Sequence, residues 1–258
     1  MRDLCVASLY QRVMPFPLET LIATPLIGLL AYIILGISGF GSALVTIPLL
    51  VHFLPLQTVV PLAVLVDFLA TATTGIRFRE DVETAELKTV VPPMIAGILA
   101  GVTLLATLPK QATVILLGAF VTGYGVYRLV AKTSTKSISR WWGIPTGLFG
   151  GLVGGLFGVG GPIYAAYLTA RIPDHARMRA TLSAVFSCST GFRLLVFLLS
   201  GLMLQKEVWW GVLLLVPSML IGLTIGHRLH AKLSREQVGG FISVLLIASG
   251  LSLLWRAF

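Results

Sequence analysis

Ten apolar segments, separated by short polar stretches, fill most of this 258-residue chain. A helix rises 1.5 Å per residue, so a segment of about 20 apolar residues is long enough to cross a bilayer. Two segments, 39–53 and 160–170, are short for a crossing and are predicted to be half-helices. The ten segments are 20–37, 39–53, 57–77, 89–108, 112–130, 141–157, 160–170, 179–200, 208–226 and 237–257.

The composition places these segments in a membrane rather than in a soluble core. Hydrophobic residues make up 56% of the chain and charged residues only 11%, and the mean hydropathy is +0.94. Such a chain lacks the polar surface of a soluble globule and needs a lipid bilayer as its partner. Its net charge of +9 lies in short clusters between apolar runs, which excludes a nucleic-acid partner and indicates membrane topology.

The two halves of the chain are copies of each other. Gly36–Ser42 aligns with Gly155–Gly161 at an offset of 119, and Pro92–Gly101 aligns with Pro217–Gly226 at an offset of 125. The expected fold is all-α and polytopic, with two repeats that each hold a short or broken helix pair and three long transmembrane helices. The expected units are an N-terminal tail (1–19), a first repeat (20–131), a cytoplasmic linker (132–140) and a second repeat (141–258).

The positive charges predict that the repeats are inverted. Four polar stretches carry twelve basic residues, whereas the intervening internal loops carry only Lys110 and Lys206. The positive-inside rule makes the four stretches cytoplasmic, so that 57–77 and its copy 179–200 cross in opposite directions and both termini face outward. The twelve are Arg77, Arg79, Lys88, Lys132, Lys136, Arg140, Arg171, Arg177, Arg179, Arg228, Lys232 and Arg235.

The glycines of 143–161 fall into two groups. Those at 143, 147, 151 and 155 recur every four residues, which is typical of a stripe for close helix packing. Gly158, Gly160, Gly161 and Pro162 follow within five positions and should interrupt the helix. Neither a P-loop nor a dinucleotide fingerprint fits, because no Gly-Lys-Ser/Thr follows the glycines and no soluble fold surrounds them.

An interrupted helix at membrane depth exposes backbone groups, which is tolerated only beside a cavity or inside protein. The half-helix that begins near Pro162 would point its positive end at such a cavity, and an anion suits that position. Its copy would do the same from the other side. The predicted substrate-binding backbone is therefore Gly39, Gly41, Gly158, Gly160 and Gly161, with the Ser42 hydroxyl as an additional donor.

Asp67 and Arg193 are the formal charges within the long segments, away from their ends. Each is costly in hydrocarbon, so each should face a cavity or a partner. Arg193 is the candidate anion ligand, with Thr190 on the same helix face; the alternatives are a structural ion pair with Asp67 or snorkelling outward. Asp67 is the candidate for proton coupling, again with the ion pair as its alternative.

The paired motifs resemble a known family. Gly39-Phe40-Gly41-Ser42 with Pro48, and Gly158-Val159-Gly160-Gly161-Pro162, in a duplicated chain of this length, are similar to the sulfite exporter TauE/SafE family. That family often has three consecutive glycines, where this chain has Gly41-Ser42-Ala43 and Gly160-Gly161-Pro162.

The resemblance implies a secondary transporter that moves a small sulfur-containing anion, sulfite or an organosulfonate, across a bacterial-type inner membrane by alternating access. The alternative is a transporter or channel for another small organic or inorganic anion. The segments show no catalytic or metal-ligating constellation, so we expect no enzyme, cofactor or metal. Assembly as a homo-oligomer stays open.

Overall fold

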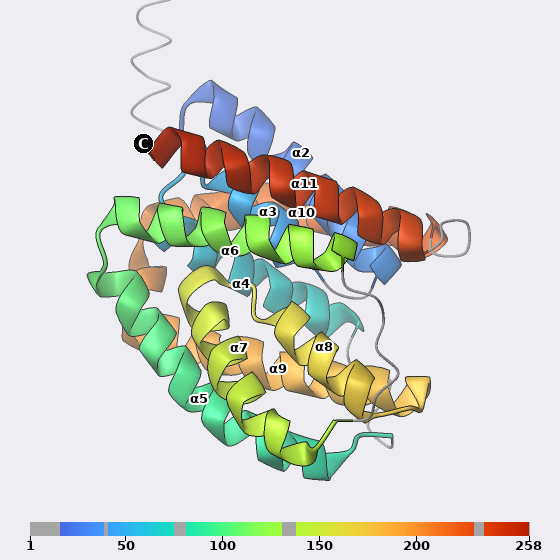
Figure 1. The fold of residues 1–258 in the computed structure, drawn as a ribbon. Coiled ribbons are helices and arrows are strands. Elements are labelled where there is room, and N and C mark those ends of the chain that lie inside the picture. Colours follow the sequence, from blue (N-terminus) through green and yellow to red (C-terminus); the bar gives the residue numbers. More distant parts are fainter. Residues whose placement is uncertain (1–15, 39–40, 75–80, 131–137, 230–234, 258) are drawn as a thin grey trace, which may run out of the picture.

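The computed structural model describes residues 16–38, 41–74, 81–130, 138–229 and 235–257 (Figure 1), and these residues form helices and no strands. The first half contains α2 (Leu18–Ser38), α3 (Ser42–Leu50), α4 (Leu56–Thr74), α5 (Thr84–Thr107) and α6 (Lys110–Val130). The second half contains α7 (Gly143–Phe157), α8 (Gly161–Arg171), α9 (His175–Leu199), α10 (Lys206–Leu229) and α11 (Arg235–Ala257), with the short 3₁₀ turns η2 (Arg140–Trp142) and η3 (Leu202–Leu204).

Six helices in the described part of the chain are long and apolar enough to cross a bilayer: α2, α5, α6, α9, α10 and α11. The predicted all-α, polytopic membrane fold is therefore confirmed, and the protein is a multi-pass membrane protein. The expected short segments are also present, since α3 has 9 residues and α8 has 11. The sequence predicts 57–77 as a long span, but the apolar stretch of α4, 56–71, is shorter than the six spans. Helix α2, predicted as part of a short or broken pair, is long enough to be one of the six.

The helix breaks lie where the glycines predict them. Helix α7 ends at Phe157 and α8 begins at Gly161, while α2 ends at Ser38 and α3 begins at Ser42. Gly158 and Gly41 adopt φ angles of 74° and 104°, in the left-handed region where a side chain would be strained. Gly39 lies outside the described residues, as do 1–15 of the predicted tail and 132–137 of the predicted linker.

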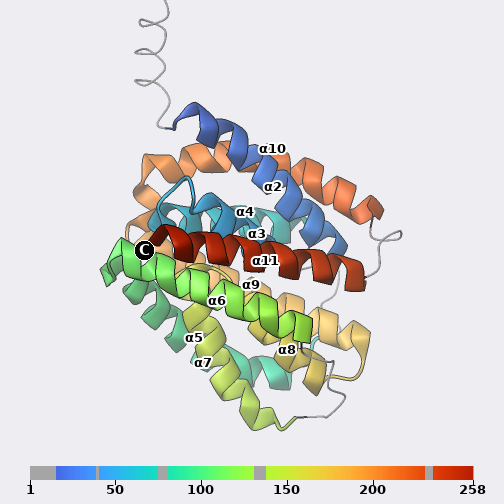
Figure 2. The same cartoon turned by 45° about the horizontal axis from the view of Figure 1, so that its top comes forward.

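Each break folds its two helices back into a hairpin. The residues on either side of the α7–α8 hairpin, Arg140 before it and Arg171 at its end, bind the same carboxylate of Glu86. Both ends of the hairpin therefore lie at one end of the molecule, and its tip points inward (Figure 1). The α2–α3 hairpin begins at the opposite end, near the C-terminus (Figure 2).

The described helix ends that flank the four basic stretches gather at one end of the molecule, on the right in Figure 1. The ion pair between Arg177 and Glu83 joins two of these regions directly. This is the common side that the positive-inside rule requires. Which side of the membrane it faces stays a prediction, as does the inverted relation of the halves.

The glycine stripe of α7 packs on α5. A methyl group at Gly147 or Gly151 would overlap a carbonyl oxygen of α5, and one at Gly155 would lie 2.6 Å from the Ile98 carbonyl oxygen. Such close approach is available only to glycine. Helix α2 packs on α10 in the same way, so each hairpin lies against a long helix of the other half.

We expect Gly151→Ala to lower the free energy of unfolding by about 1–3 kcal/mol, because its Cβ would overlap the Met94 carbonyl. Gly154→Ala, one turn along the same helix, is the matched control, since its Cβ would meet only ordinary contacts at 3.6 Å or more. The comparison is the thermal unfolding of both variants in detergent. Equal stability of the two would contradict the packing role of the stripe.

Candidate anion-binding site

The two hairpin tips meet at a small interior cavity of about 90 Å³. Liquid water occupies about 30 Å³ per molecule, so the cavity has room for a small anion. Its walls come from the ends of α2 and α7, the first turns of α3 and α8, and one face each of α4 and α9. The lining residues are Leu35, Gly41, Ser42, Ala43, Leu44, Asp67, Thr71, Gly158, Val159, Gly161, Pro162, Phe186, Thr190 and Arg193.

Most of the predicted site residues lie in this cavity, although they come from opposite halves of the sequence. Gly41, Ser42 and Asp67 line it from the first half, and a second group lines it from the second half. Gly160 is not among the lining residues. It precedes α8 and packs against the Gly150 carbonyl. The second group comprises Gly158, Gly161, Thr190 and Arg193.

Arg193 is buried, with 7% of its surface exposed, so it does not snorkel outward. Its Nη1 donates to the carbonyl oxygens of Gly154 at 3.1 Å and Gly158 at 3.0 Å. Gly154 lies in the last turn of α7, where its carbonyl also accepts from the Gly158 N–H at 2.9 Å, and Gly158 is the residue that follows the helix. The end of a helix carries partial negative charge. The guanidinium therefore satisfies the broken end of α7 and places a positive charge at the cavity wall.

One remaining guanidinium nitrogen of Arg193 faces Thr190, because Nη2 donates to Thr190 Oγ1 at 3.3 Å. The two residues are neighbours on α9 at a spacing of three, as the sequence predicts. The alternative of an ion pair with Asp67 is not what the structure shows: among the described residues, the ion pairs are made by Glu83 and Glu86.

Asp67 accepts two hydrogen bonds on one carboxylate oxygen. Tyr32 Oη donates to Oδ1 at 2.9 Å and Ser42 Oγ donates to the same atom at 2.8 Å. The carboxylate is thus fixed by α2 and α3, and it lines the same cavity as Arg193. The Ser42 hydroxyl, predicted as a donor to the anion, is here a donor to Asp67, which is the stronger acceptor close by.

Sequence reasoning missed Tyr32 and Phe186. Tyr32 is completely buried, and nothing in the apolar run of α2 indicates that its hydroxyl meets a carboxylate 35 residues later. Phe186 is the counterpart of Asp67 at the 119-residue offset. The offset could have predicted its position, because both residues line the same cavity. The carboxylate thus comes from the first half and the guanidinium from the second.

Comparison with known proteins identifies the family. The family described as Sulfite exporter TauE/SafE matches residues 25–253, which is most of the chain. The chain belongs to the sulfite exporter TauE/SafE family. It is similar to the probable inner membrane transporter protein TsaS of Comamonas testosteroni, with 30% identity over 188 residues that cover 70% of this chain and 77% of that protein. No solved structure matches it.

This TauE/SafE protein is therefore a membrane transporter, in agreement with the sequence prediction. Its fold brings described residues of the two glycine motifs, Gly41 and Ser42 of the first and Gly158 and Gly161 of the second, to the lining of one cavity. Within the described residues no group of three or more His, Cys, Asp or Glu side chains is arranged to hold a metal ion.

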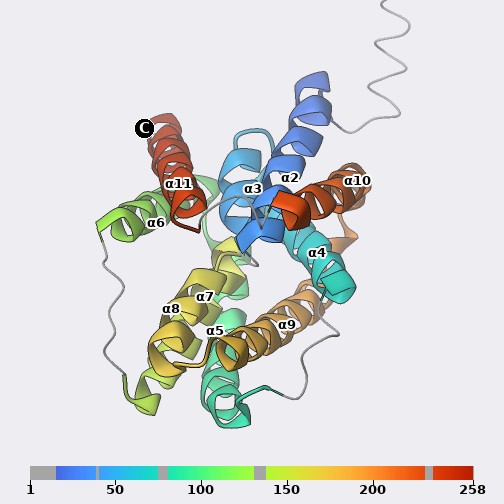
Figure 3. The same ribbon diagram turned by 90° about the vertical axis from the view of Figure 1, so that its right-hand side faces the viewer.

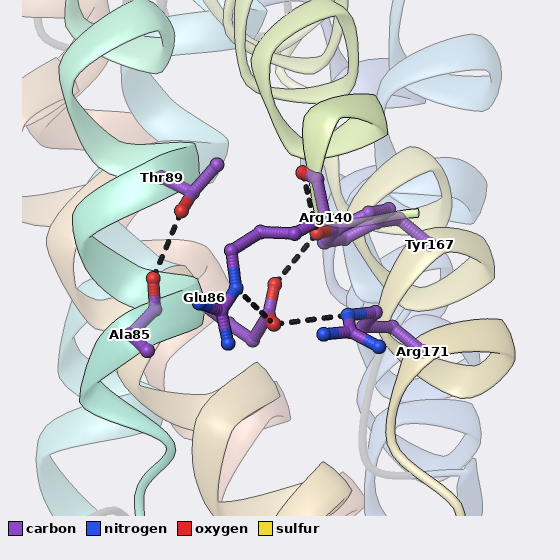
Figure 4. A network of polar contacts seen from close by, with 6 residues as sticks. All are labelled: Ala85, Glu86, Thr89, Arg140, Tyr167 and Arg171. Carbon is purple, nitrogen blue, oxygen red and sulfur yellow. Dashed lines mark hydrogen bonds and ion pairs between the residues drawn. The ribbon is translucent and has the colours of Figure 1, made fainter. Parts of the chain in front are cut away.

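A second polar cluster holds the α7–α8 hairpin of this transporter to α5 (Figure 4). The Glu86 side chain is only 4% exposed, and its Oε1 accepts from the Nε of Arg140 and of Arg171, both at 3.1 Å. Tyr167 Oη donates to the other oxygen at 2.6 Å. One buried carboxylate thus fixes the start and the end of the hairpin whose tip forms the cavity.

We expect Glu86→Gln to lower the free energy of unfolding by about 1–3 kcal/mol, because a neutral amide leaves two arginines without their countercharge. Glu83→Gln is the control: Glu83 pairs with Arg177 at the surface, where both side chains are more than a third exposed. Its loss should cost less than about 1 kcal/mol. Thermal unfolding measures both, and an equal loss would contradict the central position of Glu86.

Proposed function

We propose that the protein is a secondary transporter that carries a small sulfur-containing anion, sulfite or an organosulfonate, through this cavity by alternating access. The observation that carries the proposal is the meeting of two hairpin tips, one from each end of the molecule, at a cavity lined by a buried arginine. Opposed broken helices with a site between them are the usual construction of such transporters.

The anion would lie between the first turns of α3 and α8. Gly41 and Gly160 precede these helices and have no side chains to cap them, so the positive helix ends are available to a ligand. Arg193 adds a full positive charge at the wall. The Nη1 group of Arg193 already donates to Gly154 and Gly158, so Arg193 would not form two parallel hydrogen bonds to the anion. We assign it an electrostatic role, with Nη2 as the group that could donate to the anion.

Asp67 makes the site sensitive to protons. Two like charges about 4 Å apart repel by about 4 kcal/mol at an effective dielectric constant of 20. A carboxylate and an anion that share a cavity of about 90 Å³ are therefore poorly compatible, and a proton on Asp67 removes the conflict. Anion and proton would then bind together, which couples the flux of one to the gradient of the other.

The two hairpins are suited to movement as units. The α7–α8 hairpin is tied to α5 at its ends by Glu86 and along its length by the glycine stripe, so hairpin and helix would move together. A shift of this unit relative to the α2–α3 hairpin would open one side of the cavity while the other stays closed.

The substrate is tested by flux into proteoliposomes of purified protein, with sulfite, organosulfonates, sulfate and small carboxylates compared. We expect a sulfur anion to give saturable uptake and counterflow, and to raise the unfolding temperature of the protein. Saturable uptake of carboxylates alone would favour the alternative of another anion. Flux that never saturates and shows no counterflow would favour a channel.

The roles of the two charges are tested by substitution. Arg193→Ala and Arg193→Lys should each lower saturable flux at least about tenfold, since alanine removes the charge and lysine cannot bridge the two α7 carbonyls while facing the cavity. Arg177→Lys on the same helix is the control, because Arg177 lies at the exposed surface. Wild-type flux in a folded Arg193→Ala protein would contradict the ligand role.

Proton coupling predicts that wild-type flux rises as the pH falls, because the protonated form of Asp67 accepts the anion. Asp67→Asn imitates that form, so this variant should still bind the anion and should lose the pH dependence. Thr71→Val, one turn along α4 in the same cavity, is the control and should keep it. An unchanged pH profile in Asp67→Asn would remove Asp67 from the coupling step.

A further inference from the structure

A second and larger hollow lies between α6 on one side and α7 and α8 on the other. Figure 3 shows how these three helices are arranged. Its volume is about 660 Å³, within the range of ligand-binding pockets. We call it the lateral crevice. Its walls are apolar and rich in aromatic side chains, among them Phe120, Tyr124, Tyr127, Trp142, Phe149 and Tyr167.

The lateral crevice opens at the outer surface of the helix bundle and not into the anion cavity. Three of its aromatic residues are largely exposed: Trp142 by 60%, Tyr127 by 59% and Phe149 by 55%. Tyr127 belongs to α6, one of the spans, where an exposed side chain is in a position to meet lipid. Tyrosine and tryptophan are typical of the membrane interface, and both lie at the end of the crevice close to the chain between α6 and α7.

Positive charge lies at the same end. Arg140 is two residues before Trp142 in the turn η2, and its side chain is 52% exposed although its Nε binds Glu86. Tyr167 connects the two features, because it lines the crevice and its hydroxyl binds Glu86. With Arg171, the cluster has two positive charges against one negative charge, which leaves one positive charge in excess.

We propose that the lateral crevice binds an anionic phospholipid, with an acyl chain between α6 and α8 and the headgroup phosphate beside Arg140. An acyl chain matches the apolar and aromatic walls, and a phosphate matches the partly exposed guanidinium and the excess charge. The occupant comes from the bilayer into which the crevice opens. This inference needs only the membrane-spanning fold and is independent of the transported substrate.

The position of the crevice connects the lipid to the transport site. Pro162, in the first turn of α8, lines both the lateral crevice and the anion cavity. A bound acyl chain would therefore press on the back of the helix whose front faces the cavity. Occupancy of the crevice should hold α8 in the position described above.

The test fills the crevice with a side chain. Gly123 lines the crevice on α6, and a Cβ there meets nothing within 4 Å, so Gly123→Leu places a leucine in open space. Gly240→Leu on α11 is the matched control, since that glycine also meets nothing within 4 Å and does not line the crevice. Thermal unfolding should show both variants folded.

Binding of dioleoylphosphatidylglycerol and dioleoylphosphatidylcholine is measured by native mass spectrometry of the detergent-solubilised protein. The wild type and Gly240→Leu should retain one phosphatidylglycerol and prefer it to phosphatidylcholine, and Gly123→Leu should bind it about tenfold more weakly, a difference of about 1.4 kcal/mol. Arg140→Gln should bind the two lipids equally.

Three results would overturn the proposal. The first is wild-type retention of phosphatidylglycerol by Gly123→Leu, and the second is equal binding of both lipids by the wild type. The third is a smaller oligomer for Gly123→Leu than for the wild type in the same spectra, which would make the crevice a contact between copies of the chain. The comparison of Gly123→Leu with Gly240→Leu leaves the Glu86 cluster intact. It therefore decides the test even if Arg140→Gln fails to fold.

Discussion

Backbone groups at a broken helix inside a membrane need partners, and Arg193 supplies them for the end of α7. Its Nη1 binds the Gly158 carbonyl just after α7, and also the Gly154 carbonyl, which accepts from the Gly158 N–H as well. The same guanidinium provides the positive charge of the cavity wall. One buried side chain thus binds the end of α7 and places a positive charge at the cavity wall, so we expect substitution of Arg193 to affect both stability and anion binding.

Glycine contacts set the position of that break relative to the rest of the fold. Gly155 of α7 lies against Gly101 of α5, and their counterparts Gly36 and Gly226 lie against each other in the other pair. The two copied motifs therefore meet crosswise, each hairpin against the long helix of the opposite half. This exchange is what a two-fold relation between the repeats predicts, and it brings the two tips to one cavity.

Much of this arrangement could be predicted from the sequence because the lipid solvent restricts the choices. The lengths of the apolar segments predict the helices, and the clustered glycine and proline residues predict the breaks. Asp67 and Arg193 are conspicuous because charged residues are rare within the long segments. The partners of those charges could not be predicted. Tyr32 meets Asp67 through tertiary packing, and Glu86, near a helix end, has the appearance of an ordinary surface charge until the fold brings Arg140 and Arg171 to it.

The central claim is that a small anion binds between the tips of the two hairpins, beside Arg193. Anomalous diffraction from crystals grown with selenite, a selenium analogue of sulfite, locates such an anion directly. The account predicts one selenium peak in the cavity, between the first turns of α3 and α8 and next to the Arg193 guanidinium. A peak elsewhere in the protein, with this cavity unoccupied, would contradict it.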